Sequence, residues 1–233
     1  MKIVRNADPI DVVYTDDQWE TLHFLRKKAT PILEALQKNG MTGYVYGSVA
    51  RGDVSPTSDI DIFIYEMVSS FKVDLAFSMA GIEVIGKELS MATPSSIIKG
   101  IYYLPDEVSV SIRLTDFTSS PFQFYIFGGC ISLDDIRADK RVPGVNKALM
   151  VISPTLKGHR TYSLMGHENE ARELLKIENK MLEERIRVLE KRDKVGRTGV
   201  FLKEDIDPKD QFEAKLEQLG RKNSLIRRRM NFK

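Results

Sequence analysis

Two aspartates, Asp59 and Asp61, stand one residue apart at the start of an apolar segment. Because the side chains of a strand alternate between its two faces, both carboxylates are expected to point the same way. Carboxylates paired like this are ligands for magnesium, which takes further ligands from water and from substrate phosphates. The pair therefore predicts metal-assisted chemistry on a phosphate, with two ions stabilising the attacking and the leaving oxygens of a displacement.

A glycine–serine pair, Gly47 and Ser48, follows the apolar segment 42–46, and ten residues separate it from Asp59. Glycine lets the backbone turn sharply and approach a ligand closely. Residues 48–51 read as the first turn of a helix, whose free N–H groups attract anions. Together with the two carboxylates, this turn predicts an enzyme that binds a nucleoside triphosphate with magnesium.

Arg51 has two uses that the sequence does not separate. Its planar guanidinium suits a phosphate, which it can bind through two N–H groups. It can equally pair with Asp53 or Asp59 and stiffen the loop. Arg51 is therefore predicted, with Gly47 and Ser48, to bind the nucleotide, whereas Asp53 is expected to be a turn or capping residue.

These residues carry a resemblance to a known family. The string Gly47-Ser48-x-Ala50-Arg51-Gly52-Asp53, followed by Ser58-Asp59-Ile60-Asp61, resembles the signature of the DNA polymerase beta-like nucleotidyltransferases, in their small prokaryotic branch. The resemblance implies transfer of a nucleoside monophosphate from a triphosphate to an acceptor hydroxyl, with release of pyrophosphate. It also implies that Gly47 and Ser48 hold the outer phosphates and that Asp59 and Asp61 bind magnesium.

The family pattern includes a third acidic residue on a later strand, and here the sequence departs from it. The alternating segment 108–114 predicts such a strand, but Ser111 stands at the expected acidic position. Glu83, Glu88 and Glu107 are the substitutes that the sequence offers. Each of them reads equally well as a solvated surface acid, so the third carboxylate is either one of the three or absent.

The predicted fold is α/β or α+β, a nucleotidyltransferase palm whose mixed sheet is flanked by helices. Helices are expected at residues 16–38, 48–51, 70–80 and 94–99. Strands are expected at residues 42–46, after Asp59, and at 82–90, 101–104, 108–114, 122–127 and 148–153.

The charge is distributed unevenly along the 233 residues, whose net charge is +2. Residues 1–154 hold 15 basic and 19 acidic side chains, and residues 155–233 hold 20 and 14. With residues 155–159 as a short linker, this shift predicts a nucleotidyltransferase domain at 1–154 and a basic, mainly helical accessory domain at 155–233.

The accessory domain resembles a winged helix-turn-helix, with helices at 169–175 and 180–191 and a wing at 195–202. The run 220–233 is the most basic of the chain, and basic clusters attract polyanions. Mixed charge on the second helix suits a solvated face as well as nucleic acid, so both interpretations stay open.

Composition argues against disulfide-linked, zinc-binding, membrane-spanning and secreted proteins. Cys130 is the single cysteine, so no disulfide forms within the chain, and three histidines show no zinc-type spacing. No apolar run is long enough to span a bilayer, and the first residues do not read as a signal peptide. The sequence therefore predicts a cytoplasmic protein without a membrane partner.

Two further functions remain beside nucleotidyl transfer. Ser111 favours a catalytically impaired nucleotidyltransferase-fold protein that regulates by binding nucleotides or nucleic acid. A third hypothesis makes the chain the antitoxin partner of a toxin–antitoxin pair. For the enzyme, the acceptor is left open between a nucleic-acid end, a protein hydroxyl and a small molecule.

Overall fold

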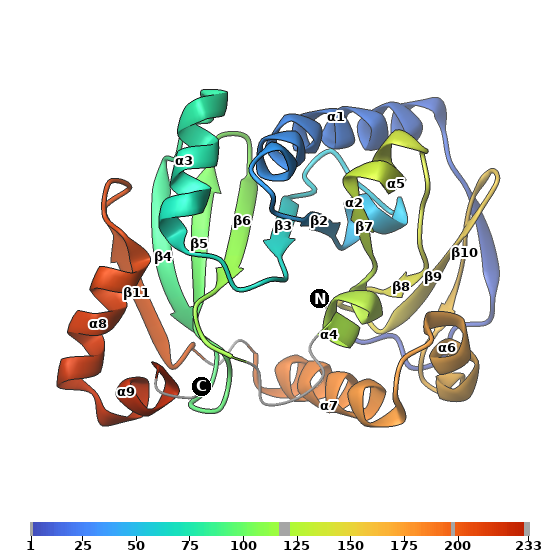
Figure 1. Cartoon of the computed structure of the whole chain (residues 1–233). Helices are drawn as coiled ribbons and strands as arrows, with labels where there is room; N and C mark the ends of the chain where they lie inside the picture. The colour runs from blue at the N-terminus through green and yellow to red at the C-terminus, as the bar shows by residue number, and fades with distance from the viewer. Residues whose placement is uncertain (1, 117–121, 197–198, 231–233) are drawn as a thin grey trace. The chain divides into compact units, whose positions relative to one another are not determined.

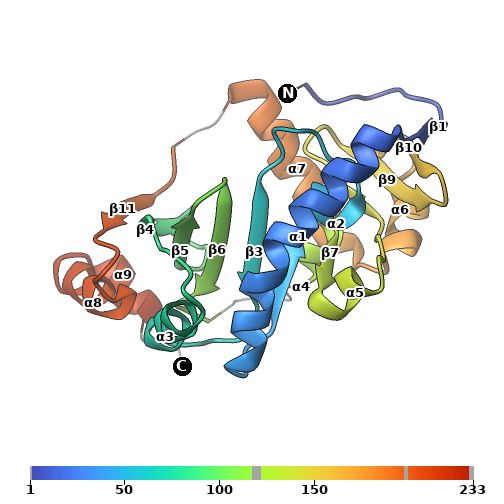
Figure 2. The same ribbon diagram turned by 90° about the horizontal axis from the view of Figure 1, so that it is seen from above.

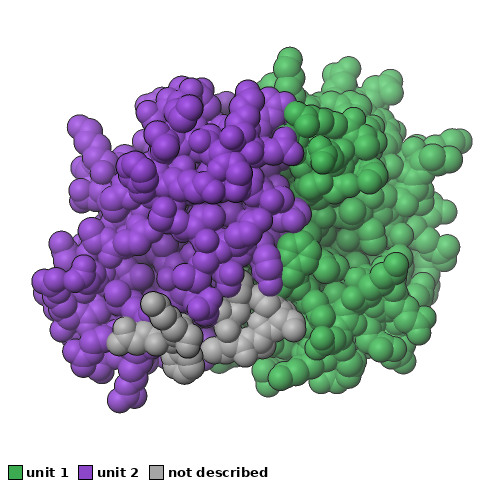
Figure 3. Space-filling view, in the orientation of Figure 1, with its two compact units in different colours: residues 1–27, 45–58, 120–198 green, residues 28–44, 59–119, 199–233 purple. Residues whose placement is uncertain are grey.

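A computed structural model describes residues 2–116, 122–196 and 199–230 of the chain. The chain folds into two compact units, each built from three chain segments (Figure 3). Unit 1 comprises Met1–Lys27, Val45–Ser58 and Ser120–Thr198, and unit 2 comprises Lys28–Tyr44, Asp59–Ser119 and Gly199–Lys233. The string from Gly47 to Asp61 therefore divides between the units after Ser58. Helix α1 (Asp16–Lys38) and strand β2 (Gly43–Tyr46) each contribute residues to both units.

Unit 1 contains an antiparallel sheet in the order β1-β10-β9-β8. Its strands are β1 (Ile10–Val13), β8 (Gly144–Val145), β9 (Met150–Thr155) and β10 (Gly158–Ser163). The predicted linker at residues 155–159 is wrong, because Thr155 pairs with Gly158 to close a β9–β10 hairpin. The division into 1–154 and 155–233 stays a prediction, and the compact units cut the chain elsewhere.

The other elements of unit 1 are mainly helical. They are α2 (Ser48–Arg51), α4 (Phe122–Gly128), β7 (Cys130–Ser132), α5 (Leu133–Arg137), α6 (Glu168–Leu175) and α7 (Asn179–Val195). Apolar residues of α6 and α7, among them Leu175 and Leu182, pack with Val151 and Tyr162 of the sheet in one buried cluster. The strand predicted at 122–127 is instead α4, because a short apolar run has no periodicity that separates a strand from a helix.

Unit 2 is built on a mixed sheet, as predicted, with the strand order β11-β4-β5-β6-β3. The strands are β3 (Ile60–Ile64), β4 (Gly86–Met91), β5 (Lys99–Leu104), β6 (Val108–Arg113) and β11 (Leu202–Ile206). β3 and β6 run parallel, and the other pairs are antiparallel. Figures 1 and 2 show helices α3 (Ser70–Ala80), α8 (Phe212–Lys222) and α9 (Ser224–Met230) on one side of strands β4–β6.

The two faces of this sheet differ in chemistry. On the helix side, Ile62, Val110 and Tyr102 are almost completely buried, and Tyr102 donates its hydroxyl to the carbonyl of Ser70 on α3. Because side chains alternate along each strand, Asp61 and Ser109 lie on the opposite face. The strands thus separate the hydrophobic core from a polar face that begins at Asp61.

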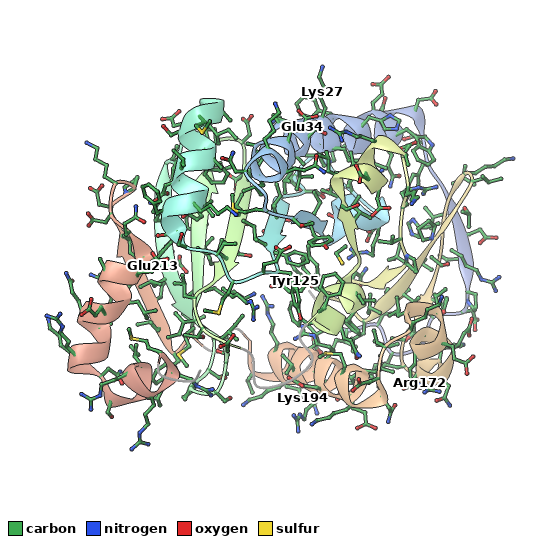
Figure 4. The ribbon with its side chains drawn as sticks, viewed as in Figure 1. Lys27, Glu34, Tyr125, Arg172, Lys194 and Glu213 are labelled. Carbon is green, nitrogen blue, oxygen red and sulfur yellow. The ribbon has the colours of Figure 1, made fainter. Side chains whose placement is uncertain are left out.

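A buried polar network holds the start of α8 against α3. The hydroxyl oxygen of Ser70 lies 2.7 Å from Gln211 Oε1 and also contacts Glu213, which is labelled in Figure 4. The Ser70 N–H donates to the same glutamate at 2.7 Å. Asp74 accepts from Gln211 at 2.8 Å and pairs with the buried Lys87 at 2.8 Å. These contacts fasten the C-terminal segment to the rest of unit 2.

Two predictions about smaller elements are not met. Residues 94–96 form turns rather than a helix, because Ser96 bonds back to Thr93, and Lys99 starts β5. The winged-helix fold is not confirmed, since Leu202 starts β11, which pairs with β4. Residues 197–198 of the predicted wing and 231–233 of the basic run lie outside the described residues. In the described ranges, no helix has the length and apolar character needed to cross a membrane.

Candidate functional site

Gly47 adopts a backbone conformation that only glycine takes readily. It follows β2 with φ 84° and ψ −139°, and its N–H donates to the Gly129 carbonyl at 2.9 Å. A Cβ placed on Gly47 would meet no heavy atom of the described residues within 4 Å. A side chain is therefore excluded by backbone strain rather than by crowding, and the backbone here can be approached.

Aromatic packing fixes the end of β2 that leads into this turn. The ring of Tyr46 stacks on Phe124 with centroids 6.0 Å apart and meets Tyr125, labelled in Figure 4, edge-on at 5.6 Å. Gly128 has no room for a Cβ, because its ideal position falls 2.4 Å from the Tyr46 ring. Packing of helix α4 on Tyr46 thereby fixes the position of the neighbouring Gly47.

Ser48 starts the single turn of α2. Its hydroxyl donates to Ser58 Oγ at 3.4 Å, and that oxygen also accepts from the Ser55 N–H at 2.9 Å. The first N–H groups of a helical turn have no acceptor within the helix. The amides of Ser48 and Val49 are therefore suited to an anion, and the serine hydroxyl is directed to the loop that leads to Asp59.

Arg51 is buried and engaged within the protein. Its Nε and Nη2 donate to both carboxylate oxygens of Asp53, each at 2.9 Å, and Nη1 donates to the Gly128 carbonyl. The side chains of Arg51 and Asp53 are only 7% and 15% exposed. These contacts favour the loop-stiffening role, so we leave Arg51 out of the phosphate-binding residues that the sequence predicted.

A second arginine holds the far end of α2. Arg26 is buried on α1, and its guanidinium donates to the Val49 carbonyl at 3.2 Å and to Asp139 at 3.2 Å. Burial lowers the pKa of Arg26, and Asp139 opposes this shift. Sequence reasoning missed this residue, because Arg26 lies in the middle of a helix and 23 residues before Val49.

The loop after α2 rests on a buried tyrosine–histidine pair. The hydroxyl of Tyr14 and Nδ1 of His159 are 2.8 Å apart, and Arg141 lies over the Tyr14 ring. Burial raises the pKa of Tyr14 to about 12 and lowers the pKa of His159. Gly52, with φ 102°, leaves space that Arg141 fills. Both rings are therefore neutral supports of the turn.

The two predicted metal ligands differ in their surroundings in unit 2. Asp59 is exposed and directly precedes β3, whereas Asp61 is half-buried within the strand. The neighbouring Ile60 N–H donates to the Glu107 carbonyl at 3.1 Å, which fixes the start of β3 beside β6. Ser109 donates its hydroxyl to Asp61 Oδ1 at 2.7 Å. Asp61 therefore has a fixed orientation, whereas Asp59 faces solvent.

The strand register shows which serine faces Asp61. Asp61 pairs with Ser109, and Phe63 pairs with Ser111. Ser111 instead donates to the Ile62 carbonyl at 3.4 Å. Ser109, and not the expected Ser111, therefore lies opposite Asp61, because register is set by strand pairing, which the sequence does not show.

The glutamates named as substitutes differ in how far they lie from β3, since the Glu107 backbone borders the start of that strand and Glu88 lies on a distant strand. Glu83 is exposed ahead of β4, and Glu107 is exposed in the β5–β6 turn with φ 58°. Glu88 is buried on β4, where Tyr103 donates to it at 2.9 Å and Lys203 pairs with it at 3.4 Å. Since β4 is three strands from β3, their backbones are roughly 14 Å apart. Glu88 therefore belongs to its own polar group.

Tyr103 belongs to that polar group. Burial raises the pKa of Tyr103 to about 12, and the hydrogen bond to Glu88 adds to the shift. Both groups lie on the face of Asp61 but on more distant strands. They form a neutral donor paired with an acid rather than a metal ligand set.

The two aspartates of the site fit one magnesium ion better than two. Asp59 and Asp61 supply hard oxygen ligands, and triphosphate oxygens supply the rest. Among the residues described, no three histidine, cysteine, aspartate or glutamate side chains gather as a metal cluster. In the part of the chain that the structure describes, no third acid gathers with Asp59 and Asp61 to complete the two-ion arrangement that the sequence predicts.

Comparison with known proteins agrees with the part of the chain that carries these residues. Residues 26–106 match the family model described as the nucleotidyltransferase domain. The matched range includes Gly47, Ser48, Asp59 and Asp61 and ends before Ser109. No curated protein matches the chain.

Proposed function

We propose, from the nucleotidyltransferase domain that this chain contains at residues 26–106, that it moves a nucleoside monophosphate from a triphosphate to an acceptor hydroxyl. Pyrophosphate would be the second product. The observation that carries the proposal is the strand that presents Asp61, oriented by Ser109 at 2.7 Å, directly after the exposed Asp59. Nucleotidyl transfer needs such oxygen ligands beside the phosphate that reacts.

The residues divide the work of binding and orientation. Gly47 and Ser48 would contact the outer phosphates through backbone N–H groups and the Ser48 hydroxyl. Asp59 and Asp61 would hold magnesium, which neutralises phosphate charge when it is bound. Arg51 and Arg26 would keep α2 rigid without touching the nucleotide. In phosphoryl chemistry, positioning and charge stabilisation supply most of the catalysis.

The proposal also covers the acceptor and the cellular compartment. The exposed arginines Arg227 and Arg228 on α9 support a nucleic-acid acceptor or partner, because basic side chains attract phosphates. We retain the cytoplasm as the place of action on the sequence prediction alone.

A second candidate function is nucleotide binding without transfer. It is favoured by one observation, that the described residues gather no third acid around Asp59 and Asp61. Such a protein would regulate a partner, as in the antitoxin hypothesis, by holding a nucleotide or nucleic acid.

The test of transfer uses the intact chain and triphosphates labelled at the α-phosphate. Each of the four ribonucleotides is incubated with magnesium and with RNA, DNA, protein or small-hydroxyl acceptors, and both label transfer and pyrophosphate are measured. The proposal expects transfer that the Asp59→Asn/Asp61→Asn variant lacks. Magnesium-dependent binding without transfer to any acceptor would favour the second function, and no binding would contradict both.

A further inference from the structure

Ser109 makes a short polar contact with Asp61, one of the two predicted metal ligands. The two residues are register partners on parallel strands, so their side chains leave the sheet on the same face. The hydroxyl donates to Oδ1 at 2.7 Å, a normal length for an O–H···O bond. Ser109 is half-buried, and this burial limits the access of water that would compete for the bond.

A serine at this position changes the charge of the site. A hydroxyl orients a carboxylate by donating to it, but it adds no negative charge with which to hold a second cation. The groups on the neighbouring strand β5 do not supply that charge, because Tyr103 is a neutral phenol engaged with Glu88. The described residues show no cluster of three acids. Asp59 and Asp61 thus supply the protein ligands of one divalent ion, and the triphosphate supplies further ligands of that same ion.

We propose that Ser109 is a positioning residue that holds Asp61 for a single divalent cation, so that the chain binds one cation, and not two, with each nucleotide. The inference rests on the proposed function, because it concerns the same triphosphate site. It goes further by assigning a role to Ser109, which lies outside the matched range, and by limiting the site to one cation.

The fold supplies a matched control. Ser111 lies on the same strand and the same face as Ser109, two residues further on, but it pairs with Phe63. Its hydroxyl contacts the Ile62 carbonyl at 3.4 Å. An acid introduced there adds the same charge to the same strand without facing Asp61 directly.

The experiment counts cations in the complex. The full chain is equilibrated with Mn²⁺ and a triphosphate whose α–β bridge is a methylene group, and bound manganese and bound nucleotide are both measured after rapid gel filtration. The unmodified chain is expected to retain one Mn²⁺ per nucleotide. The Ser109→Asp variant is expected to retain two, with the electron spin resonance signal of a coupled pair, and the Ser111→Asp variant is expected to retain one.

A second set of variants tests the positioning role itself. Ser109→Ala is expected to weaken Mn²⁺ binding in the complex by roughly 10-fold, as for other groups that orient a metal ligand. Ser109→Thr keeps the hydroxyl and is expected to restore the affinity. Urea unfolding of each variant identifies a loss that comes from the fold alone.

The outcomes separate this inference from the proposed function. Two Mn²⁺ per nucleotide in the unmodified chain would overturn the inference and leave nucleotidyl transfer standing. Equal affinity in the unmodified, Ser109→Ala and Ser109→Thr chains would overturn the positioning role. One Mn²⁺ per nucleotide in Ser109→Asp would overturn the claim that the serine limits the site to one cation. If the unmodified chain retains no nucleotide, the proposed function fails and the inference fails with it.

Discussion

Two charged pairs lie within eleven residues of each other and behave in opposite ways. Arg51 is buried, Asp53 is largely shielded from solvent, and the two side chains form two hydrogen bonds of 2.9 Å. Asp59 is exposed, and Asp61 is half-buried and accepts a hydrogen bond from the neutral hydroxyl of Ser109 at 2.7 Å. The motif therefore contains residues that build the turn and residues that we propose to meet the substrate, and burial with side-chain pairing distinguishes the first kind from the second.

The difference has an energetic counterpart. Breaking a buried ion pair by removing one partner costs about 3–5 kcal/mol, because the other charge stays buried without its partner. Exposed acids contribute little to stability. Substitution of Arg51 or Asp53 should therefore mainly lower stability, and substitution of Asp59 and Asp61 should mainly lower activity.

The largest effect is expected from the two acids. Asp59→Asn/Asp61→Asn should lower nucleotidyl transfer by about 10³-fold or more, since metal-held charge is worth several kcal/mol in such reactions. The free energy of unfolding, measured in urea, should change little. A variant that transfers the label at the normal rate would remove the distinction between the two pairs.

Arg51→Met should have the opposite result. It is expected to lower the free energy of unfolding by about 3–5 kcal/mol, because Asp53 remains buried without its partner. Arg51→Met/Asp53→Asn is the control, and should recover part of the loss. If Arg51→Met leaves stability intact but abolishes triphosphate binding, Arg51 touches the nucleotide after all.

A comparison of two serines sharpens the distinction further. Ser70 and Ser109 both contact a carboxylate, but Ser70 is completely buried in the α3–α8 network. Ser70→Ala should lower the free energy of unfolding by about 1–3 kcal/mol, the cost of leaving buried polar groups unpaired. Urea unfolding of both alanine variants tests this, and a larger loss in Ser109→Ala would contradict the assignment.

The smallest effect concerns pH. Burial lowers the pKa of His159, while the charges of Asp53, Arg141 and Arg51 act on it in both directions. Below the ordinary histidine pKa, the unfolded chain takes up a proton that the folded chain resists. Stability should therefore fall as the pH drops below about 6.5, by at most about 1.4 kcal/mol per pH unit for this group. His159→Gln should show a shallower loss of stability between pH 7.5 and 5.5, and an identical pH profile would contradict this role.

Local patterns predicted a large part of the fold. The helices at 16–38 and 70–80 are confirmed, because helix formation there follows from the residues of each segment and those directly beside it. The strand that carries Asp61 is confirmed for the same reason. The mixed sheet is likewise confirmed.

The wrong predictions concern residues whose structure depends on contacts with segments far away in the sequence. The aromatic run at 122–127 is a helix, and Leu202 joins β4 instead of forming a wing. In the site, the sequence named Asp59 and Asp61 but pointed to Ser111, whereas Ser109 faces Asp61, which depends on the β3–β6 register. Arg26 escaped notice because its acceptors lie on another element.

The most direct test of the central claim is calorimetric titration of a non-hydrolysable triphosphate into the intact chain. The titration is made with magnesium and with EDTA, for the unmodified protein and for Asp59→Asn/Asp61→Asn. Binding that requires magnesium, and that the variant loses, is the result we predict. Equal affinity in all four titrations would contradict a triphosphate site built on these two acids.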